Sequence, residues 1–163
     1  MADQKIAYAS SADFTCTLAS LASDSNLLAG RESTAIDNSS NLYLDYLVTG
    51  TFTVASSGLG TSDSINVYLY ARETDSTWPE DVTGSDADLT WDSAETRDAG
   101  LVLLASIATN NTGSQTYSMA PVSVAACFGG VVPTGFGLWV VQNTGGALAS
   151  GTLSYKPIYS TVS

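Results

Sequence analysis

Apolar and polar residues alternate with a period of two along much of the chain. Phe14, Cys16 and Leu18 alternate with small or polar residues, which predicts a strand near residues 13–21. The same alternation predicts two long strands near residues 42–54 and 65–72. Further strands are expected near residues 89–91, 101–108, 114–119, 122–128, 136–143 and 151–159. The pattern therefore predicts eight or nine strands.

Turn clusters rich in Gly, Asn, Asp and Ser separate these segments, for example at residues 56–60 and 143–146. A polar, turn-rich stretch is expected at 24–41, and no segment has the apolar spacing of a long helix. These features predict an all-β fold, a jelly-roll-like antiparallel β-sandwich, with an immunoglobulin-like sandwich left open. A chain of 163 residues suits a single domain, spanning residues 1–163, in which residues 1–12 could form an N-terminal arm.

Residues 120–141 contain no charge and are apolar enough to suggest a membrane span. Pro121, Pro133 and four glycines interrupt them, so two strands around a turn are expected instead. The first five residues lack the apolar stretch of a secretory signal. Cys16 and Cys127 are therefore expected to be free, packed thiols in a reducing compartment, with a disulfide between them as the alternative.

Charge is distributed unevenly along the chain. The formal net charge is −11, and the five basic residues are scattered, which argues against nucleic acid or an anionic membrane as a partner. Nine of the sixteen acidic residues lie within residues 73–98, which predicts an acidic, exposed excursion on the solvent-facing side. Residues 99–155 carry no charge, which predicts that subunit contacts lie there; the alternative is central strands with Ser and Thr on their surface.

Catalytic equipment is largely missing from the sequence. There is no His, so catalytic systems and zinc sites built on imidazole are excluded. A non-enzymatic protein without a cofactor is expected, and no catalytic, cofactor-binding or metal residue is assigned. The alternatives are a glycosidase-like carboxylate pair, and a calcium site at Asp86, Asp88 and Asp92. A sugar-stacking platform is a further alternative to plain core packing for six aromatic residues, namely Tyr43, Tyr68, Tyr70, Trp78, Trp91 and Trp139.

Five segments spread over nearly the whole chain resemble small virion proteins of tailed bacteriophages. They begin with residues 18–38 (LASLASDSNLLAGRESTAIDN) and 42–50 (LYLDYLVTG). The others are residues 65–70 (INVYLY), 121–130 (PVSVAACFGG) and 155–159 (YKPIY). The likeness is one of residue pattern and local sequence, and it includes no catalytic signature.

The resemblance implies a capsid cement or decoration protein with a jelly-roll fold. Such a protein is made in the host cytoplasm and sits on the capsid exterior, where it binds the major capsid protein and stabilises the shell. The resemblance also implies a homo-oligomer, with a trimer expected and a dimer as the alternative. The contact residues are unknown, although Thr152 and Ser154 are expected to face outward at a subunit contact. A fibre or tail-associated protein, and a carbohydrate-binding β-sandwich module of a virion fibre or cell surface, remain alternatives.

Overall fold

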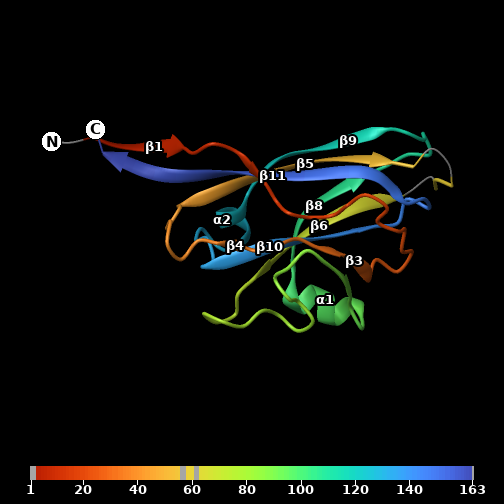
Figure 1. Ribbon diagram of the computed structural model, residues 1–163, viewed down its shortest axis with the longest axis horizontal. Coiled ribbons are helices and arrows are strands. Elements are labelled where there is room, and N and C mark those ends of the chain that lie inside the picture. Colours follow the sequence, from red (N-terminus) through yellow and green to blue (C-terminus); the bar gives the residue numbers. More distant parts are fainter. Residues whose placement is uncertain (1–2, 56–57, 61–62, 163) are drawn as a thin grey trace.

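The computed structural model of the chain describes residues 3–55, 58–60 and 63–162. Residues 1–2 of the arm expected at 1–12, and residues 56–57 of the turn expected at 56–60, lie outside the described residues. Eleven strands and two short helices run through the described part of the chain (Figure 1). The strands are β1 (Gln4–Tyr8), β2 (Ala12–Asp13), β3 (Ala29–Glu32), β4 (Ile36–Asp37), β5 (Asp45–Val54), β6 (Ser64–Ala71), β7 (Ala87–Thr90), β8 (Val102–Ala108), β9 (Thr116–Ser123), β10 (Gly135–Gln142) and β11 (Leu148–Val162). The helices are α1 (Ala94–Gly100) and α2 (Val124–Cys127).

The strands form two antiparallel sheets that pack face to face as a sandwich, so the predicted all-β sandwich is confirmed. Sheet A has the order β1–β11–β5–β9, and β2 also pairs with β11. Sheet B has the order β7–β3–β10–β6–β8, and β4 also pairs with β10. The strand count exceeds the eight or nine expected because none of the four N-terminal strands, β1 to β4, was predicted, and strands of two to five residues are too brief to show a clear period in the sequence.

The main core lies between the two sheets, where the alternating residues of each strand meet. In β5 the buried side chains include Tyr46, Val48, Phe52 and Val54, with the intervening residues facing out. Every residue of β10 is buried, because this strand is covered on both of its faces. Fully burying one such large apolar side chain stabilises the fold by about 1.5–3 kcal/mol.

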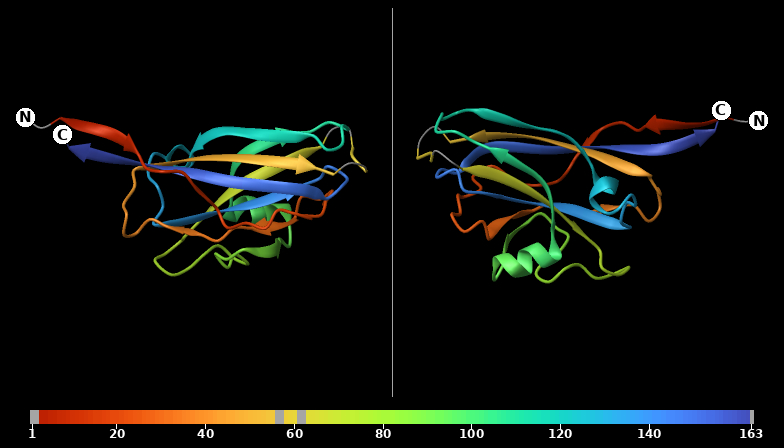
Figure 2. Two further views of the ribbon diagram at one scale, coloured as in Figure 1. Left: turned by 45° about the horizontal axis from the view of Figure 1, so that its top comes forward. Right: turned by 180° about the vertical axis from the view of Figure 1, so that it is seen from behind.

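The segment that joins β6 to β8, including β7 and α1, covers the outer face of sheet B (Figure 2). Its apolar side chains form a second core, in which Trp91 meets Trp139 edge to face with ring centroids 6.5 Å apart. Eight of the nine carboxylate residues between 73 and 98 are exposed, and only Asp86 is half-buried. The acidic segment is therefore packed onto the sandwich through its apolar residues while its carboxylates face solvent.

Helix α1 was not expected, because it is only seven residues long and lacks an apolar period. Ser93 and Thr96 form a capping box at its start, in which the Ser93 hydroxyl accepts from the Thr96 backbone N–H. Arg97 is buried beneath the helix, where its Nη1 donates to the Leu27 carbonyl at 2.8 Å and its guanidinium lies 5.3 Å from the Tyr68 ring centroid. These contacts attach the helix to sheet B.

Two other expectations about strands were wrong. The strand predicted at 13–21 is absent: Phe14 and Leu18 are buried as the alternation suggested, but the ladder ends at Asp13 and Ser20 turns the chain with a φ of 68°. The segment at 24–41, expected to be turn-rich only, contains β3 and β4. The alternation correctly indicated which side chains point inward, but an extended segment can bury alternate side chains without pairing with another strand.

The uncharged segment 120–141 also differs from the expected pair of strands. The strands expected at 114–119 and 122–128 are one strand, β9, followed by α2. Ser123 caps α2 by accepting from the Ala126 N–H, and the Asp45 carboxylate accepts from the Ala125 N–H at 2.9 Å. Pro121 is tolerated because β9 is an edge strand. Neither helix in the described residues is long and apolar enough to cross a membrane.

Strand β1 and the last part of β11 leave the sandwich together as a two-stranded ribbon (Figures 1 and 2). They pair antiparallel from Tyr8 opposite Ile158 to Gln4 opposite Val162. We call this ribbon, residues 4–8 with 158–162, the terminal arm. It extends past the end of sheet B, so neither of its faces is packed between the two sheets.

Candidate docking face and terminal arm

The outer face of sheet A presents an array of hydroxyl side chains. In the strand register Thr51 lies opposite both Ser118 and Thr152. Because directly paired residues point to the same side of a sheet, and their neighbours along each strand face the core, these side chains all point away from sheet B. The full set is Thr49, Thr51, Thr53, Thr116, Ser118, Ser150, Thr152 and Ser154.

None of these eight side chains is charged, which is notable in a chain with a net charge of −11. Thr53 and Thr116 hydrogen-bond each other at 2.9 Å, and Ser154 donates to the Asp13 carboxylate at 2.5 Å. Thr152 points outward as predicted and is exposed, and Ser154 points the same way but is half-buried. The hydroxyl groups can satisfy a partner's hydrogen bonds, and the Thr methyl groups can pack against apolar atoms, without the cost of burying a charge.

The same face continues along β11 onto the terminal arm. Lys156, Ile158, Ser160 and Val162 follow Ser154 at every second position. On β1, Tyr8, Ile6 and Gln4 lie opposite Ile158, Ser160 and Val162 and so share this face. The Lys156 ammonium lies 5.8 Å from the centroid of the Tyr8 ring. The outer face of sheet A is thus rich in hydroxyl groups over the sandwich and largely apolar over the arm, and by the strand register it includes the charged residues Asp13, Asp45 and Lys156. We call the whole of it the docking face.

Exposed apolar side chains gather at the arm. Of the nine large apolar residues that are exposed in the described part of the chain, six belong to the arm or to the loop before β5. These six are Ile6, Tyr8, Leu42, Leu44, Tyr159 and Val162. Single exposed apolar residues are normal, but a contiguous group of them marks an interaction surface.

The two sides of the molecule differ in charge. Arg31, Arg72 and Arg97 each pair with a carboxylate within the chain. Lys5 and Lys156, which lie on or beside the arm, form no salt bridge within the described residues. The segment of residues 73–98, whose carboxylate residues are mostly exposed, lies over sheet B, on the opposite side of the sandwich from the docking face (Figure 2). The docking face therefore carries few charges, among them Asp13, Asp45 and Lys156, whereas the opposite side is strongly acidic.

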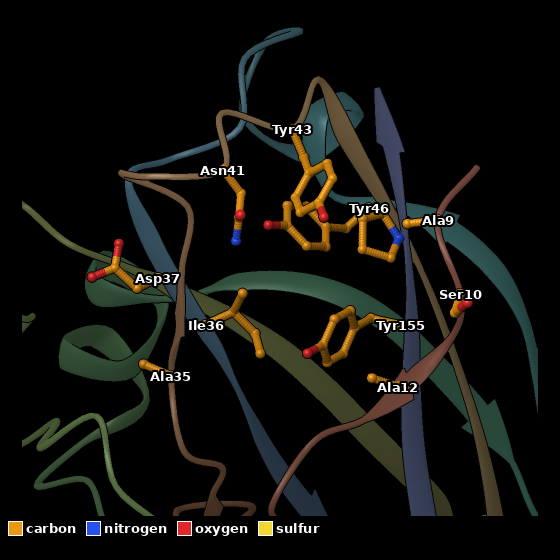
Figure 3. A pocket seen from close by; sticks show the side chains of 11 residues that line it. Ala9, Ser10, Ala12, Ala35, Ile36, Asp37, Asn41, Tyr43, Tyr46 and Tyr155 are labelled. Carbon is orange, nitrogen blue, oxygen red and sulfur yellow. The ribbon is translucent and has the colours of Figure 1, made fainter. Parts of the chain in front are cut away.

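A hollow of about 450 Å³ opens where the arm leaves the sandwich (Figure 3). Tyr43, Tyr46 and Tyr155 line it, and their rings contact one another. The Tyr46 hydroxyl donates to the Asn38 side chain at 2.9 Å, and burial raises the pKa of Tyr46 above its ordinary value. A second hollow adjoins it, lined among others by Leu42, Leu44 and Tyr159, and we call the two together the foot pocket. The first hollow is also lined by Ala9, Ser10, Ala12, Ala35, Ile36, Asp37, Asn41 and Pro157.

The carboxylates considered for calcium serve another purpose. Arg31 donates to Asp86 at 2.6 Å and to Asp88 at 2.9 Å, and the Thr17 hydroxyl donates to Asp86 at 2.6 Å. Burial raises the pKa of Asp86, but the bonds from Arg31 and Thr17 outweigh it and hold that pKa at about 2. Among the described residues, Asp92 joins no group of three metal-ligating side chains, nor does any other carboxylate.

The six aromatic residues considered for sugar stacking do not form a platform. Tyr68, Tyr70, Trp91 and Trp139 are buried in the second core. Trp78, the ring expected to be most exposed, is half-buried: it packs edge to face on Tyr70 and lies under the Arg72 guanidinium, 5.0 Å away. Tyr43 alone reaches the foot pocket. The core-packing alternative therefore holds for four of the six rings.

Cys16 and Cys127 are free, as predicted, and neither is suited to chemistry. Burial raises the pKa of the Cys16 thiol to about 12, and the nearby Asp86 carboxylate adds to this effect. Burial also raises the pKa of Cys127. Thiolate is the reactive form, so both residues are expected to be inert packing groups.

Sequence reasoning suggested an N-terminal arm at residues 1–12, but it missed the pairing of that segment with residues 158–162, and it missed the foot pocket. The signal for the arm was present in the alternation at 156–162, but its partner strand at 4–8 has only two large apolar residues and no turn adjoining it. No protein-family model and no curated protein sequence matches this chain. The molecule is therefore characterised by its own features, an all-β sandwich with a hydroxyl-rich docking face that carries few charges, a projecting arm and an acidic opposite side.

Proposed function

We propose that this chain is a structural virion protein, a cement or decoration protein that binds the outside of a tailed-phage capsid and stabilises the shell. One observation carries the proposal: the sandwich presents a hydroxyl-rich and apolar docking face with few charges on sheet A and a strongly acidic surface on the opposite side. The segments that resemble phage virion proteins, from residues 18–38 to 155–159, point to the same class. Its partners are the major capsid protein and further copies of itself.

The order of the strands supports a jelly roll. If β1 and β2 are counted as one strand, β3 and β4 as one, and β7 is set aside, eight strands remain. Sheet A then contains the first, eighth, third and sixth strands, and sheet B the second, seventh, fourth and fifth. Two sheets with this interleaved order describe a jelly roll, a fold used by viral capsid proteins. The acidic segment is then an insertion between the fourth and fifth strands.

The distribution of charge suggests how the protein would lie on a capsid. The hydroxyl array and the apolar arm can pack against neighbouring capsid subunits while burying few charges, whereas burying the nine carboxylates of residues 73–98 would require many matched cations. The acidic side then faces solvent, where its charge keeps particles apart. A protein that binds across two subunits of the assembled shell stabilises that assembly by mass action. No catalytic step is needed.

The carbohydrate-binding alternative rests on one observation, the foot pocket. Tyr43 offers a ring, and Asn41 and Asp37 offer polar groups, in a hollow open to solvent. Aromatic rings combined with a few polar groups suit a small polar ligand. Binding of soluble glycans that is abolished by Tyr43→Ala but unchanged by a charge on the docking face would favour this alternative.

Imaging particles from which this protein has been removed tests the proposal. Particles of the phage that encodes the chain should keep their tails and fibres but break open at a lower temperature. Adding the purified protein back should restore their stability. Particles without the protein that lack tails or fibres, or whose shells are equally resistant, would contradict the proposal.

A further inference from the structure

The terminal arm has two faces, and only one of them belongs to the docking face. A flat capsid surface that contacts the docking face would leave the other, inner face uncovered. Ala7 lies opposite Tyr159 and Lys5 opposite Thr161, so these four side chains point to the side of the foot pocket. Tyr159 meets Tyr43 edge to face at 6.2 Å, but Lys5 and Thr161 are exposed. A two-stranded ribbon alone is at best marginally stable in water. The arm therefore needs a cover on this inner face as well.

The foot pocket has the features of a surface waiting for such a cover. Leu42 and Leu44 at its rim are 71 % and 50 % exposed. Leu42 also has a φ of 51°, a left-handed conformation that costs free energy for a residue with a bulky side chain. A strained backbone that displays an apolar side chain to solvent is typical of binding sites.

We propose that the terminal arm of one copy lies with its inner face on the foot pocket of a second copy. The proposal rests on the proposed function, because it supplies the contact that would hold the copies of a virion protein together. The five residue pairs of the arm span about 17 Å at 3.3–3.4 Å per residue, so the tip stands well away from the foot of its own chain. If the second copy runs antiparallel to the first, the tip of each arm reaches the foot pocket of the other copy.

Symmetry allows this contact to close. In a two-fold pair, both arms and both foot pockets are used at once. In a ring of three, each arm lies on the foot pocket of the next copy, and none remains free. Both arrangements place the contact at the arm, whereas the sequence suggested the uncharged residues 99–155.

Charge favours a second copy as the occupant. Lys5, at the tip, has no salt bridge within the described residues. The foot pocket is lined by Asp37, whose carboxylate is more than half exposed and lies 3.8 Å from Arg72. Apart from the two lysines near the arm, the chain is strongly acidic, so a second copy is a complementary surface for a cationic arm.

Crosslinking between two differently tagged preparations tests the arrangement directly. One preparation carries Lys5→Cys at the tip of the arm, and the other carries Asn41→Cys at the foot. Each preparation carries only one introduced cysteine, so the disulfide between the two introduced cysteines cannot form within one chain. The native thiols are half-buried. Mild oxidation should produce a mixed-tag dimer. The control replaces Asn41→Cys by Thr90→Cys, an exposed position on β7, and should produce at least about tenfold less.

Sedimentation velocity on the full chain supplies an independent measurement. Leu44→Asp should weaken self-association by roughly tenfold or more, because the contact would bury an unpaired charge. Leu103→Asp is the matched control, since Leu103 is also 50 % exposed but lies on β8. A chain that is monomeric at every concentration, or two variants that behave alike, would overturn the proposal. A chain that associates through its arms but is absent from virions would instead refute the proposed function alone.

Discussion

Replacing Asp86 with Asn tests how the acidic segment is fastened to the sandwich. The Asp86 carboxylate accepts from Arg31 on β3 at 2.6 Å, and from the Thr17 N–H and hydroxyl at 2.9 and 2.6 Å. Arg31 also donates to the Asp86 carbonyl at 3.0 Å. One half-buried carboxylate thus joins β3, the acidic segment and the chain that follows β2. The variant should lower the free energy of unfolding.

The size of the effect follows from the pKa of Asp86. Its ordinary value of 3.8 is lowered to about 2 by bonds from Arg31 and Thr17 that outweigh the opposing effect of burial. At about 1.4 kcal/mol per pH unit, this lowering corresponds to at most about 2.5 kcal/mol. The side chain is 17 % exposed, and solvent screening reduces the contribution to about 1–2 kcal/mol.

The pH dependence has a definite sign. Because the pKa of Asp86 is lower in the folded chain than in the unfolded chain, its contribution is fully present above about pH 4. The contribution is lost as the pH falls through about 2, where the folded carboxylate takes up a proton. The difference in stability between the wild type and Asp86→Asn should therefore be constant near neutral pH and shrink between pH 4 and 2.

Urea unfolding followed by tryptophan fluorescence measures this difference. Asp88→Asn is the matched control, since Asp88 pairs with the same guanidinium but is 86 % exposed, and it should cost less than about 0.5 kcal/mol. Equal losses in the two variants, or no loss in Asp86→Asn, would refute the reasoning. Calcium should leave the midpoint unchanged; a rise on adding it would show that these carboxylates bind the ion.

Three further predictions concern single positions. Gly30→Ala should cost more than about 2 kcal/mol, because its Cβ would lie 2.7 Å from the Trp139 ring and also collide with the backbone of β10; circular dichroism melts measure this. Cys16 and Cys127 should react with a thiol reagent at pH 8 only after denaturation, and fast labelling of the folded chain would contradict the burial that raises their pKa. Leu42→Asn should raise the free energy of unfolding by about 0.5–1 kcal/mol, since Asn tolerates a positive φ, and it should weaken self-association. A variant in which both the free energy of unfolding and self-association fall would contradict strain at this position.

The sequence predicted the parts of the fold that depend on local alternation. Phe52 and Val54 of β5, and Leu138 and Val140 of β10, lie in the core as their period-two spacing requires. The strand β3 was missed because Arg31 and Glu32 are polar, although Glu32 is fully buried. Its carboxylate accepts three hydrogen bonds, from the Thr83 N–H and hydroxyl and from the Gly84 N–H, and these partners are some fifty residues away. Such long-range pairing leaves no local trace.

The candidate site was less accessible to prediction than the fold. Outward positions such as Thr152 could be assigned from alternation, but the docking face exists only because β5, β9 and β11 are neighbours in sheet A. The arm depends on β1 pairing with residues at least 150 positions away. The uncharged stretch 99–155 indicated an interface, yet most of the exposed large apolar residues lie outside it, near the two ends of the chain and in the loop before β5.

The central claim is that the chain covers a capsid with its hydroxyl-rich docking face inward, and an electron-cryomicroscopy map of intact virions tests it most directly. The account predicts density for the sandwich on the outer shell, with Thr51 and Thr152 of sheet A against the capsid subunits. Residues 73–98 should point into solvent. Density placing the acidic segment against the shell, or placing the protein on the tail and nowhere on the capsid, would contradict the account.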